Sequence, residues 1–271
     1  MYNELLGAEV NVPEEPRRIV SLAEDLTETL FMVGVGDRVV GVSAYCHKPA
    51  EACGRVRVGT YLRVSYARLE QLRPDLILTT SAAQRRVNLE LLERGYPVYP
   101  LPLPLSLAGI VENVRRVGVL VNAVEKAVEL GQRLLATLAR YSINKQRGRR
   151  RVYVEIDLGS PITVGAATYV DDFIRILGLE NIFGDRIIGY FEPVMDEVKR
   201  LNPEVIIYDP KPNDSSARLR FMRLVDDRGW RDVDAVKQDR IIVTEGDVIA
   251  HYGPSLILDT LPEMSRWLGG D

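Results

Sequence analysis

Residues able to bind a metal or act in catalysis are scarce in this sequence. The 271-residue chain contains 2 histidines, His47 and His251, and 2 cysteines, Cys46 and Cys53. Cys46, His47 and Cys53 offer three soft ligands, one fewer than a structural zinc site uses. No Gly-x-Ser-x-Gly sequence is present to indicate a hydrolase nucleophile. We therefore expect no resident metal and no catalytic residues.

A second polar group surrounds His251, in the loop between the last predicted strand and the last predicted helix. Glu245 and Asp247 precede this histidine by a few residues. The loop is either a plain polar connection or a segment that contacts a ligand. A two-lobed enzyme such as a tetrapyrrole metal chelatase would need His251 paired with Glu24 or Glu245, and we keep it as an alternative.

Aromatic residues give a broader signal, because six of them lie in predicted loops or at element ends rather than at core positions. A tyrosine supplies apolar area and a hydroxyl group with little loss of conformational entropy. Each of these side chains alone could simply pack. Together they suggest a wide ligand held between two walls: Tyr45, Tyr61, Tyr169, Tyr190, Phe191 and Tyr252.

The composition is that of a globular protein, with 46% hydrophobic and 27% charged residues. A net charge of -3 predicts no basic face for nucleic acid. The first 18 residues contain acids and prolines and no apolar core of a signal peptide. This predicts a cytoplasmic protein if Met1 is the native start, and an extracytoplasmic protein at the membrane face if the chain is a trimmed mature form. We favour two free thiols over a disulfide.

Strands and helices alternate along both halves of the chain, which predicts an α/β fold with mostly parallel sheets. In the first half the predicted strands are Arg17–Leu22, Arg38–Ser43, Asp75–Thr80 and Pro97–Leu101, and the helices are Thr27–Val33, Tyr66–Leu72, Gln84–Arg94 and Leu107–Val121. In the second half the predicted strands are Val152–Ile156, Val205–Tyr208 and Arg240–Thr244, and the helices are Tyr169–Leu177, Pro193–Leu201, Ala217–Asp227 and Pro254–Leu268.

An internal repeat and a long helix organise these elements. Leu72–Ile77 (LRPDLI) matches Leu201–Ile206 (LNPEVI), and each follows a short helix and opens a strand. We predict an N-terminal lobe over 1–105, a connecting helical segment over 106–148 and a C-terminal lobe over 149–271, with a ligand cleft between the lobes. The connector contains a backbone helix over 122–146 with Asn122 as N-cap. Its expected apolar stripe, which we expect to contact both lobes, is Val124, Ala127, Val128, Gly131, Leu134, Leu135 and Leu138.

The order and spacing of several short motifs resemble one family over about residues 6–268. These motifs are Arg18–Leu22, Thr27–Glu28, Gly34–Ser43, Tyr45–Pro49, Val58–Gly59, Leu72–Ile77, Asn181–Phe183, Leu201–Ile207 and Gly253–Pro254. Together they resemble the cobalamin- and ferric-siderophore-type substrate-binding proteins of ABC importers, the helical-backbone class, and most closely the cobalamin-binding branch. The resemblance implies two α/β lobes joined by one long helix.

The resemblance implies a monomeric, non-enzymatic binding protein for a large metal chelate, most simply a cobalamin-like corrinoid, with no cofactor of its own. The expected ligand contacts are Tyr45, Tyr61, Glu24, Gln84, Tyr169, Tyr190, Phe191, His251 and Tyr252. A ferric siderophore remains an alternative because of Arg63, Arg85 and Arg86. Haem is another, with a tyrosine or histidine as axial ligand. A binding protein for bare zinc or manganese ranks last, since two histidines cannot form a multi-histidine cage.

Importer-associated members of this family carry one acidic residue per lobe for docking on a permease. Asp196, seven residues before Pro203, fits that position. The equivalent position before Pro74 is Ala67, and the nearest acid on the same predicted helix is Glu70. The resemblance therefore implies an ABC permease as partner, with Asp196 and Glu70 as its contacts.

Overall fold

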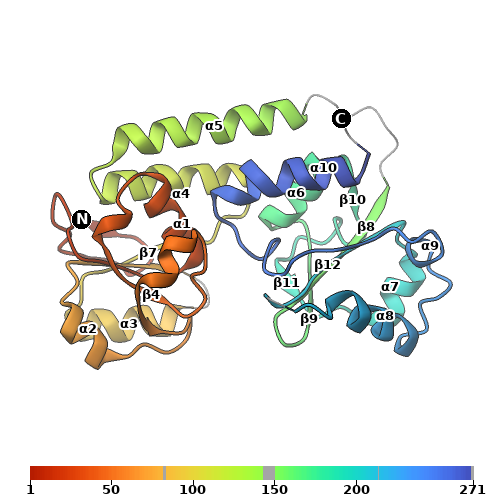
Figure 1. Cartoon of the computed structure of the whole chain (residues 1–271), viewed down its shortest axis with the longest axis horizontal. Helices are drawn as coiled ribbons and strands as arrows, with labels where there is room; N and C mark the ends of the chain where they lie inside the picture. Colours follow the sequence, from red (N-terminus) through yellow and green to blue (C-terminus); the bar gives the residue numbers. More distant parts are fainter. Residues whose placement is uncertain (82–83, 143–149, 213, 270–271) are drawn as a thin grey trace. The chain divides into compact units, whose positions relative to one another are not determined.

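The protein is an α/β protein, described by a computed structural model over residues 1–81, 84–142, 150–212 and 214–269. Its chain divides into two compact units (Figure 1). Unit 1 comprises Met1–Pro104 with Ala108–Ala136, and unit 2 comprises Leu105–Leu107 with Thr137–Asp271. The predicted fold class, with an α/β lobe from each half of the chain, is confirmed.

Unit 1 contains a five-stranded parallel sheet in the order β5-β4-β3-β6-β7. Helices α2 and α3 cover one face of it, where side chains such as Val20 and Ile77 are buried, and α1 and α4 (Leu107–Leu120) cover the other (Figure 1). The predicted loop 45–62 contains an additional strand, β5. The strands are β3 (Ile19–Ser21), β4 (Val39–Ser43), β5 (Val56–Gly59), β6 (Leu76–Thr80) and β7 (Val98–Leu101); the helices are α1 (Glu24–Met32), α2 (Tyr66–Leu72) and α3 (Arg85–Glu93). A small hairpin, β1 (Tyr2–Asn3) and β2 (Ala8–Glu9), precedes them.

Unit 2 has a mixed sheet in the order β11-β9-β8-β12-β13, with β10 also paired to β8. Strands β8, β12 and β13 are parallel, whereas β9 is antiparallel to both β8 and β11. The strands are β8 (Arg151–Asp157), β9 (Pro161–Val164), β10 (Glu180–Asn181), β11 (Tyr190–Phe191), β12 (Val205–Asp209) and β13 (Ile241–Val243). The helices are α6 (Tyr169–Ile176), α7 (Met195–Leu201), α8 (Ala217–Asp227), α9 (Asp234–Lys237) and α10 (Leu261–Trp267), the last preceded by a π-helical turn (Leu256–Thr260).

The internal repeat extends to individual hydrogen bonds. In unit 1 the Arg18 side chain donates to the carbonyl of Leu72 at 2.7 Å, and the Asp75 carboxylate accepts the Arg18 N–H at 2.9 Å. These bonds attach the end of α2 to the start of β3. The same bonds in unit 2 join Arg151 to the Leu201 carbonyl at 2.7 Å and to the Glu204 carboxylate at 2.9 Å.

The predicted long helix begins later than expected, because Asn122 belongs to the end of the preceding helix. Helix α4 spans Leu107–Leu120 and α5 spans Val124–Ser142. Asn122 has a φ of 54°, and the N–H of Ala123 reaches back to the carbonyl of Gly118 at 2.7 Å. This is the Schellman arrangement, in which a left-handed residue terminates a helix. The prediction of Asn122 as an N-cap is therefore wrong.

The buried face of α5 is also rotated from the predicted stripe. Ala127, Leu130, Gly131 and Leu134 are buried, whereas the predicted stripe members Val124, Val128 and Leu135 are exposed. The buried face packs on α4, where a Cβ added to Gly118 would overlap that of Ala127. Residues 143–146 of the predicted helix lie outside the described residues.

Candidate functional site

The parallel sheet of unit 1 brings its predicted ligand residues to one edge. Parallel strands end at the same side of a sheet, and ligands of open α/β sheets bind beyond these carboxyl ends. Glu24 follows β3, Tyr45 and His47 follow β4, Tyr61 follows β5, and Gln84 follows β6. A carboxylate oxygen of Glu24 lies within 4.8 Å of a ring nitrogen of His47, so these two side chains do meet.

Gln84 is fully buried at this edge and connects three segments. Its amide nitrogen donates to the carbonyls of Leu22 and Tyr61, both at 3.1 Å, and its amide oxygen accepts the N–H of Thr80 at 2.8 Å. The hydroxyl groups of Tyr61 and Thr80 are hydrogen-bonded at 2.8 Å. The Gln84 side chain thus fixes the loop that carries Tyr61.

Two large side chains remain exposed at the same edge, Tyr45 at 51% and Leu62 at 63%. The His47 ring is hydrogen-bonded to the Tyr45 carbonyl at 2.7 Å, which orders the loop after β4. Leu62 escaped sequence analysis because an isolated leucine in a polar loop carries no periodic signal. The available signal was its neighbour Tyr61, an aromatic residue that closely follows the end of β5.

The two cysteines are free, as expected. Cys46 is completely buried, and its sulfur lies 3.1 Å from the hydroxyl groups of both Thr27 and Ser43. Burial raises the pKa of the Cys46 thiol above its ordinary value, and the nearby Glu24 carboxylate adds to this. Cys53 is exposed.

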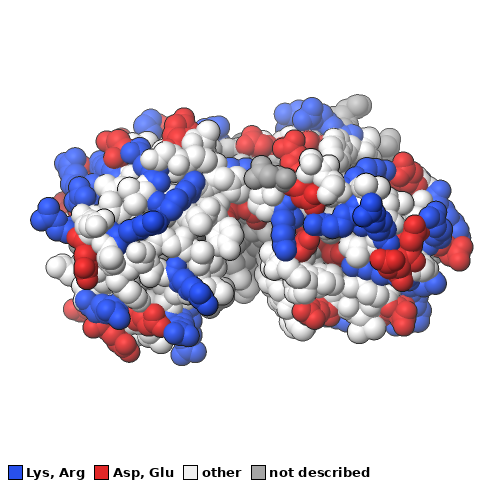
Figure 2. All heavy atoms as spheres, turned by 60° about the horizontal axis from the view of Figure 1, so that its bottom comes forward, with Lys and Arg blue, Asp and Glu red and all other residues white. Residues whose placement is uncertain are grey.

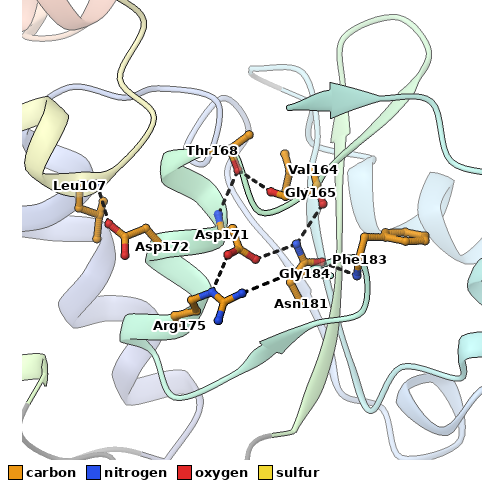
Figure 3. A network of polar contacts seen from close by, with 10 residues as sticks. All are labelled: Leu107, Val164, Gly165, Thr168, Asp171, Asp172, Arg175, Asn181, Phe183 and Gly184. Atoms are coloured by element: carbon orange, nitrogen blue, oxygen red, sulfur yellow. Dashed lines mark hydrogen bonds and ion pairs between the residues drawn. The ribbon is translucent and has the colours of Figure 1, made fainter. Parts of the chain in front are cut away.

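In unit 2 a polar network fixes the start of α6 (Figure 3). The hydroxyl of Thr168 caps the helix by accepting the N–H of Asp171 at 3.2 Å. Asn181 donates to the Asp171 carboxylate and to the Val164 carbonyl, both at 3.0 Å, and Arg175 lies 2.6 Å from the same carboxylate. The Asn-Ile-Phe motif thus ties α6 to the sheet, next to Tyr169.

Three of the predicted tyrosines form a cluster at that helix start. Tyr169 is 1% exposed and donates its hydroxyl to the carbonyls of Ile249 and Ala250, at 2.9 and 3.0 Å. Its ring centroid lies 5.5 Å from that of Tyr252. Burial, followed by the neighbouring phenols of Tyr190 and Tyr252, raises the pKa of Tyr169 well above its ordinary value. The fold thus brings together Tyr169 and Tyr252, which lie 83 positions apart in the sequence (252 − 169).

Two exposed isoleucines adjoin this cluster and were missed by sequence analysis. Ile187 is 94% exposed and Ile188 43%, next to the predicted contact Tyr190, which is 37% exposed. The Ala167 N–H donates to the Ile188 carbonyl at 3.2 Å, which places this segment beside the start of α6. Isoleucines next to a short strand resemble core residues in the sequence. Phe191 instead packs edge-on against Phe183, with ring centroids 5.3 Å apart.

The loop after β13 carries His251, which is 2% exposed, and the half-buried Tyr252. Asp209, at the end of β12, is fully buried and accepts hydrogen bonds from this loop. Burial raises the pKa of the Asp209 carboxyl group, against the opposing effect of hydrogen bonds from Thr244, Val248 and Ala250. Sequence analysis did not select Asp209, because its partners lie 35 or more residues further along the chain.

The predicted docking acids are accessible on equivalent helices. Glu70 is exposed on α2, and Asp196 is exposed on α7. Ala67, at the position equivalent to Asp196, is also exposed. Positive and negative side chains are interspersed over the face shown in Figure 2.

A cavity of about 450 Å³ lies at the opposite, amino edge of the unit 2 sheet. Val205 and Ile241, at the starts of β12 and β13, line it together with Arg240 and Trp267. None of the predicted ligand residues borders this cavity. It is therefore separate from the residues that the carboxyl edges bring together.

Among the described residues, none of the helices is long and apolar enough to cross a lipid bilayer.

Two relatives match most of the chain. The uncharacterized ABC transporter substrate-binding lipoprotein YvrC of Bacillus subtilis is 25% identical over 92% of this chain and 79% of its own length. The vitamin B12-binding protein of Pectobacterium carotovorum is 25% identical over 90% of this chain and 85% of its own length.

Solved structures share the fold. The periplasmic vitamin B12 binding protein BtuF of Vibrio cholerae superimposes with a TM-score of 0.75 at 23% identity, over 95% of this chain and 98% of that one. The periplasmic heme-binding protein RhuT of Roseiflexus sp. RS-1 gives a TM-score of 0.81 at 22% identity, over 94% and 98% of the two chains. A model of the periplasmic binding protein family matches residues 19–248. The chain therefore belongs to the periplasmic binding protein family, whose members bind solutes and are not enzymes.

Proposed function

We propose that the protein binds a cobalamin-like corrinoid and presents it to an ABC importer. The observation that carries this proposal is the set of apolar and aromatic side chains at the carboxyl edge of unit 1 and beside the tyrosine cluster of unit 2. Tyr45 and Leu62 are exposed in the first unit, and Ile187 and Tyr190 in the second. Large ligands are bound mainly by apolar and aromatic surface, with a few polar groups for orientation. The relatives named as vitamin B12-binding proteins support the corrinoid.

Haem is the second candidate, supported by the partly exposed phenols of Tyr45 and Tyr190. A tyrosine oxygen can serve as an axial ligand of haem iron. The ferric-siderophore alternative rests on Arg63, Arg85 and Arg86, and of these Arg86 forms a solvent-exposed ion pair with Glu90 at 2.7 Å. A chelatase is not favoured, since the family is one of binding proteins.

The proposed partner is an ABC permease, contacted through Glu70 on α2 and Asp196 on α7. The equivalence of the two helices supports this, because both end at the same arginine-to-carbonyl hydrogen bond, and Glu70 is the exposed acid of α2, three residues beyond the position equivalent to Asp196. The extracytoplasmic location is likewise a proposal, and of the two expected locations it is the one we favour. It is supported by relatives described as a lipoprotein and as periplasmic proteins.

Quenching of intrinsic fluorescence tests the ligand. Purified protein is titrated with cyanocobalamin, haem, a ferric catecholate and a ferric hydroxamate. We expect saturable binding of cyanocobalamin, weakened about tenfold by Tyr190→Ala, because the loss of an aromatic contact costs about 1–2 kcal/mol. Tyr2→Ala is the matched control: Tyr2 is 60% exposed in the N-terminal hairpin and should leave the affinity unchanged. A lack of response to all four compounds would overturn the proposed function.

A further inference from the structure

The loop 244–252 is irregular backbone that must nevertheless hold two proposed ligand residues in place. Buried backbone N–H and C=O groups need partners, and this loop has no strand ladder to supply them. Five of its peptide N–H and C=O groups, all in residues 248–250, instead bond to two side chains from other elements. These are Asp209 of β12 and Tyr169 of α6.

The carboxylate of Asp209 accepts hydrogen bonds from backbone N–H groups of the loop. These are the N–H groups of Val248 at 3.0 Å, Ile249 at 2.9 Å and Ala250 at 3.0 Å. It also accepts the hydroxyl of Thr244. Four donors thus converge on two oxygens of one fully buried side chain.

The side chain of Tyr169 bonds to backbone carbonyl groups of the same loop. Its hydroxyl group bonds to the carbonyls of Ile249 and Ala250. These are the residues whose N–H groups bond to Asp209. The ring of Tyr169 also packs against Tyr252. The side chain that bonds to the loop carbonyls is therefore in contact with a proposed ligand residue.

The first part of the loop lies tightly against the segment after β12. The N–H of Asp247 donates to the Pro210 carbonyl at 3.1 Å. Gly246 has a φ of 92°, and a Cβ there would lie 2.5 Å from the Lys211 carbonyl oxygen. A glycine is required at such a close approach. These contacts, together with those to Asp209 and Tyr169, hold residues 244–250 of the loop before any ligand arrives.

We propose that Asp209 is a positioning residue of the ligand site, which holds loop 244–252 so that His251 and Tyr252 are preformed for binding. The proposal rests on the proposed function. A carboxylate is suited to the task because it only accepts hydrogen bonds, whereas an asparagine would turn an NH₂ group toward N–H donors. A preformed loop binds more tightly than one that must be ordered on binding.

The test combines Asp209→Asn with Tyr252→Ala in a double-mutant cycle, with cyanocobalamin as the probe. We expect Asp209→Asn to weaken binding at least tenfold in the otherwise unchanged protein and by a clearly smaller factor in the Tyr252→Ala background, because part of its effect passes through Tyr252. Glu155→Gln is the matched control. Glu155 is also a buried carboxylate of unit 2, paired with Arg228 at 2.7 Å, and its replacement should leave the affinity within twofold.

Amide hydrogen exchange of the ligand-free protein supplies an independent reading. Residues 248–250 should be protected in the unmodified protein and exchange at least tenfold faster in Asp209→Asn, while β8 and β12 remain protected. Unchanged exchange would overturn the proposal, as would additive affinity losses or an equal loss in Glu155→Gln. If the unmodified protein binds none of the four compounds, the proposed function fails, and exchange still decides whether Asp209 holds the loop.

Discussion

At the scale of single residues, buried polar side chains set the conformation of the loops that carry the proposed ligand contacts. Gln84 does this in unit 1 and Asp209 in unit 2, each with hydrogen bonds to backbone groups far away in sequence. Gln84 was selected as a ligand contact that the family resemblance implies. Asp209 was not selected, although it directly follows the predicted strand Val205–Tyr208, because nothing in the sequence near Asp209 reveals donors some 40 residues away.

The two thiols should differ sharply in reactivity. The thiolate is the reactive form, and burial both raises the pKa of Cys46 and blocks access to it. We expect the folded protein at pH 8 to react with one equivalent of Ellman's reagent, through Cys53, and the unfolded protein to react with two. Cys53→Ser should abolish the reaction of the folded protein. Rapid modification of two thiols in the folded state would contradict the buried position of Cys46.

At the scale of elements, the sequence was sufficient for the central strands and their helices but not for short edge strands or for one helix boundary. The runs around Ile19 and Val205 are apolar, buried on both faces and easily recognised. Strands β10 and β11 contain only two residues each, which is too short for a periodic pattern. Asn122 is favoured both as an N-cap and in the left-handed conformation, so its type alone did not decide between two helix ends.

The contact between α4 and α5 gives a paired test of helix packing. A Cβ at Gly118 would overlap that of Ala127, whereas one at Gly131 would lie 3.6 Å from Val111, an ordinary contact distance. We expect Gly118→Ala to lower the free energy of unfolding by about 1–3 kcal/mol through overpacking. Gly131→Ala should leave it unchanged or raise it by up to about 1 kcal/mol, because alanine favours the helix.

Urea unfolding followed by circular dichroism measures both variants. Gly131 lies in the interior of α5 and Gly118 in the last turn of α4, so the helix propensity gain from alanine differs between them by no more than about 1 kcal/mol. A larger difference between the variants therefore reports the packing of the two helices. Equal effects on stability would show that the helices do not approach each other closely at Gly118.

At the scale of the whole molecule, the repeated Leu-x-Pro-acid pattern was the most informative feature of the sequence. It predicted two α/β lobes, and the structure shows the same arginine and acid contacts in both units. The chemical identity of the ligand could not be predicted in the same way, because exposed apolar and aromatic side chains can bind a corrinoid or a haem. The nine predicted contacts therefore stand as a proposal, while the family follows from the match over residues 19–248.

Calorimetric titration with cyanocobalamin tests the central claim most directly. We predict saturable binding of one corrinoid per chain, with a negative heat-capacity change because apolar surface of the ligand and the protein is buried. Haem and the two ferric siderophores, titrated under the same conditions, should bind at least tenfold more weakly. An absence of binding heat with cyanocobalamin at several temperatures, or a clear preference for haem, would contradict the account.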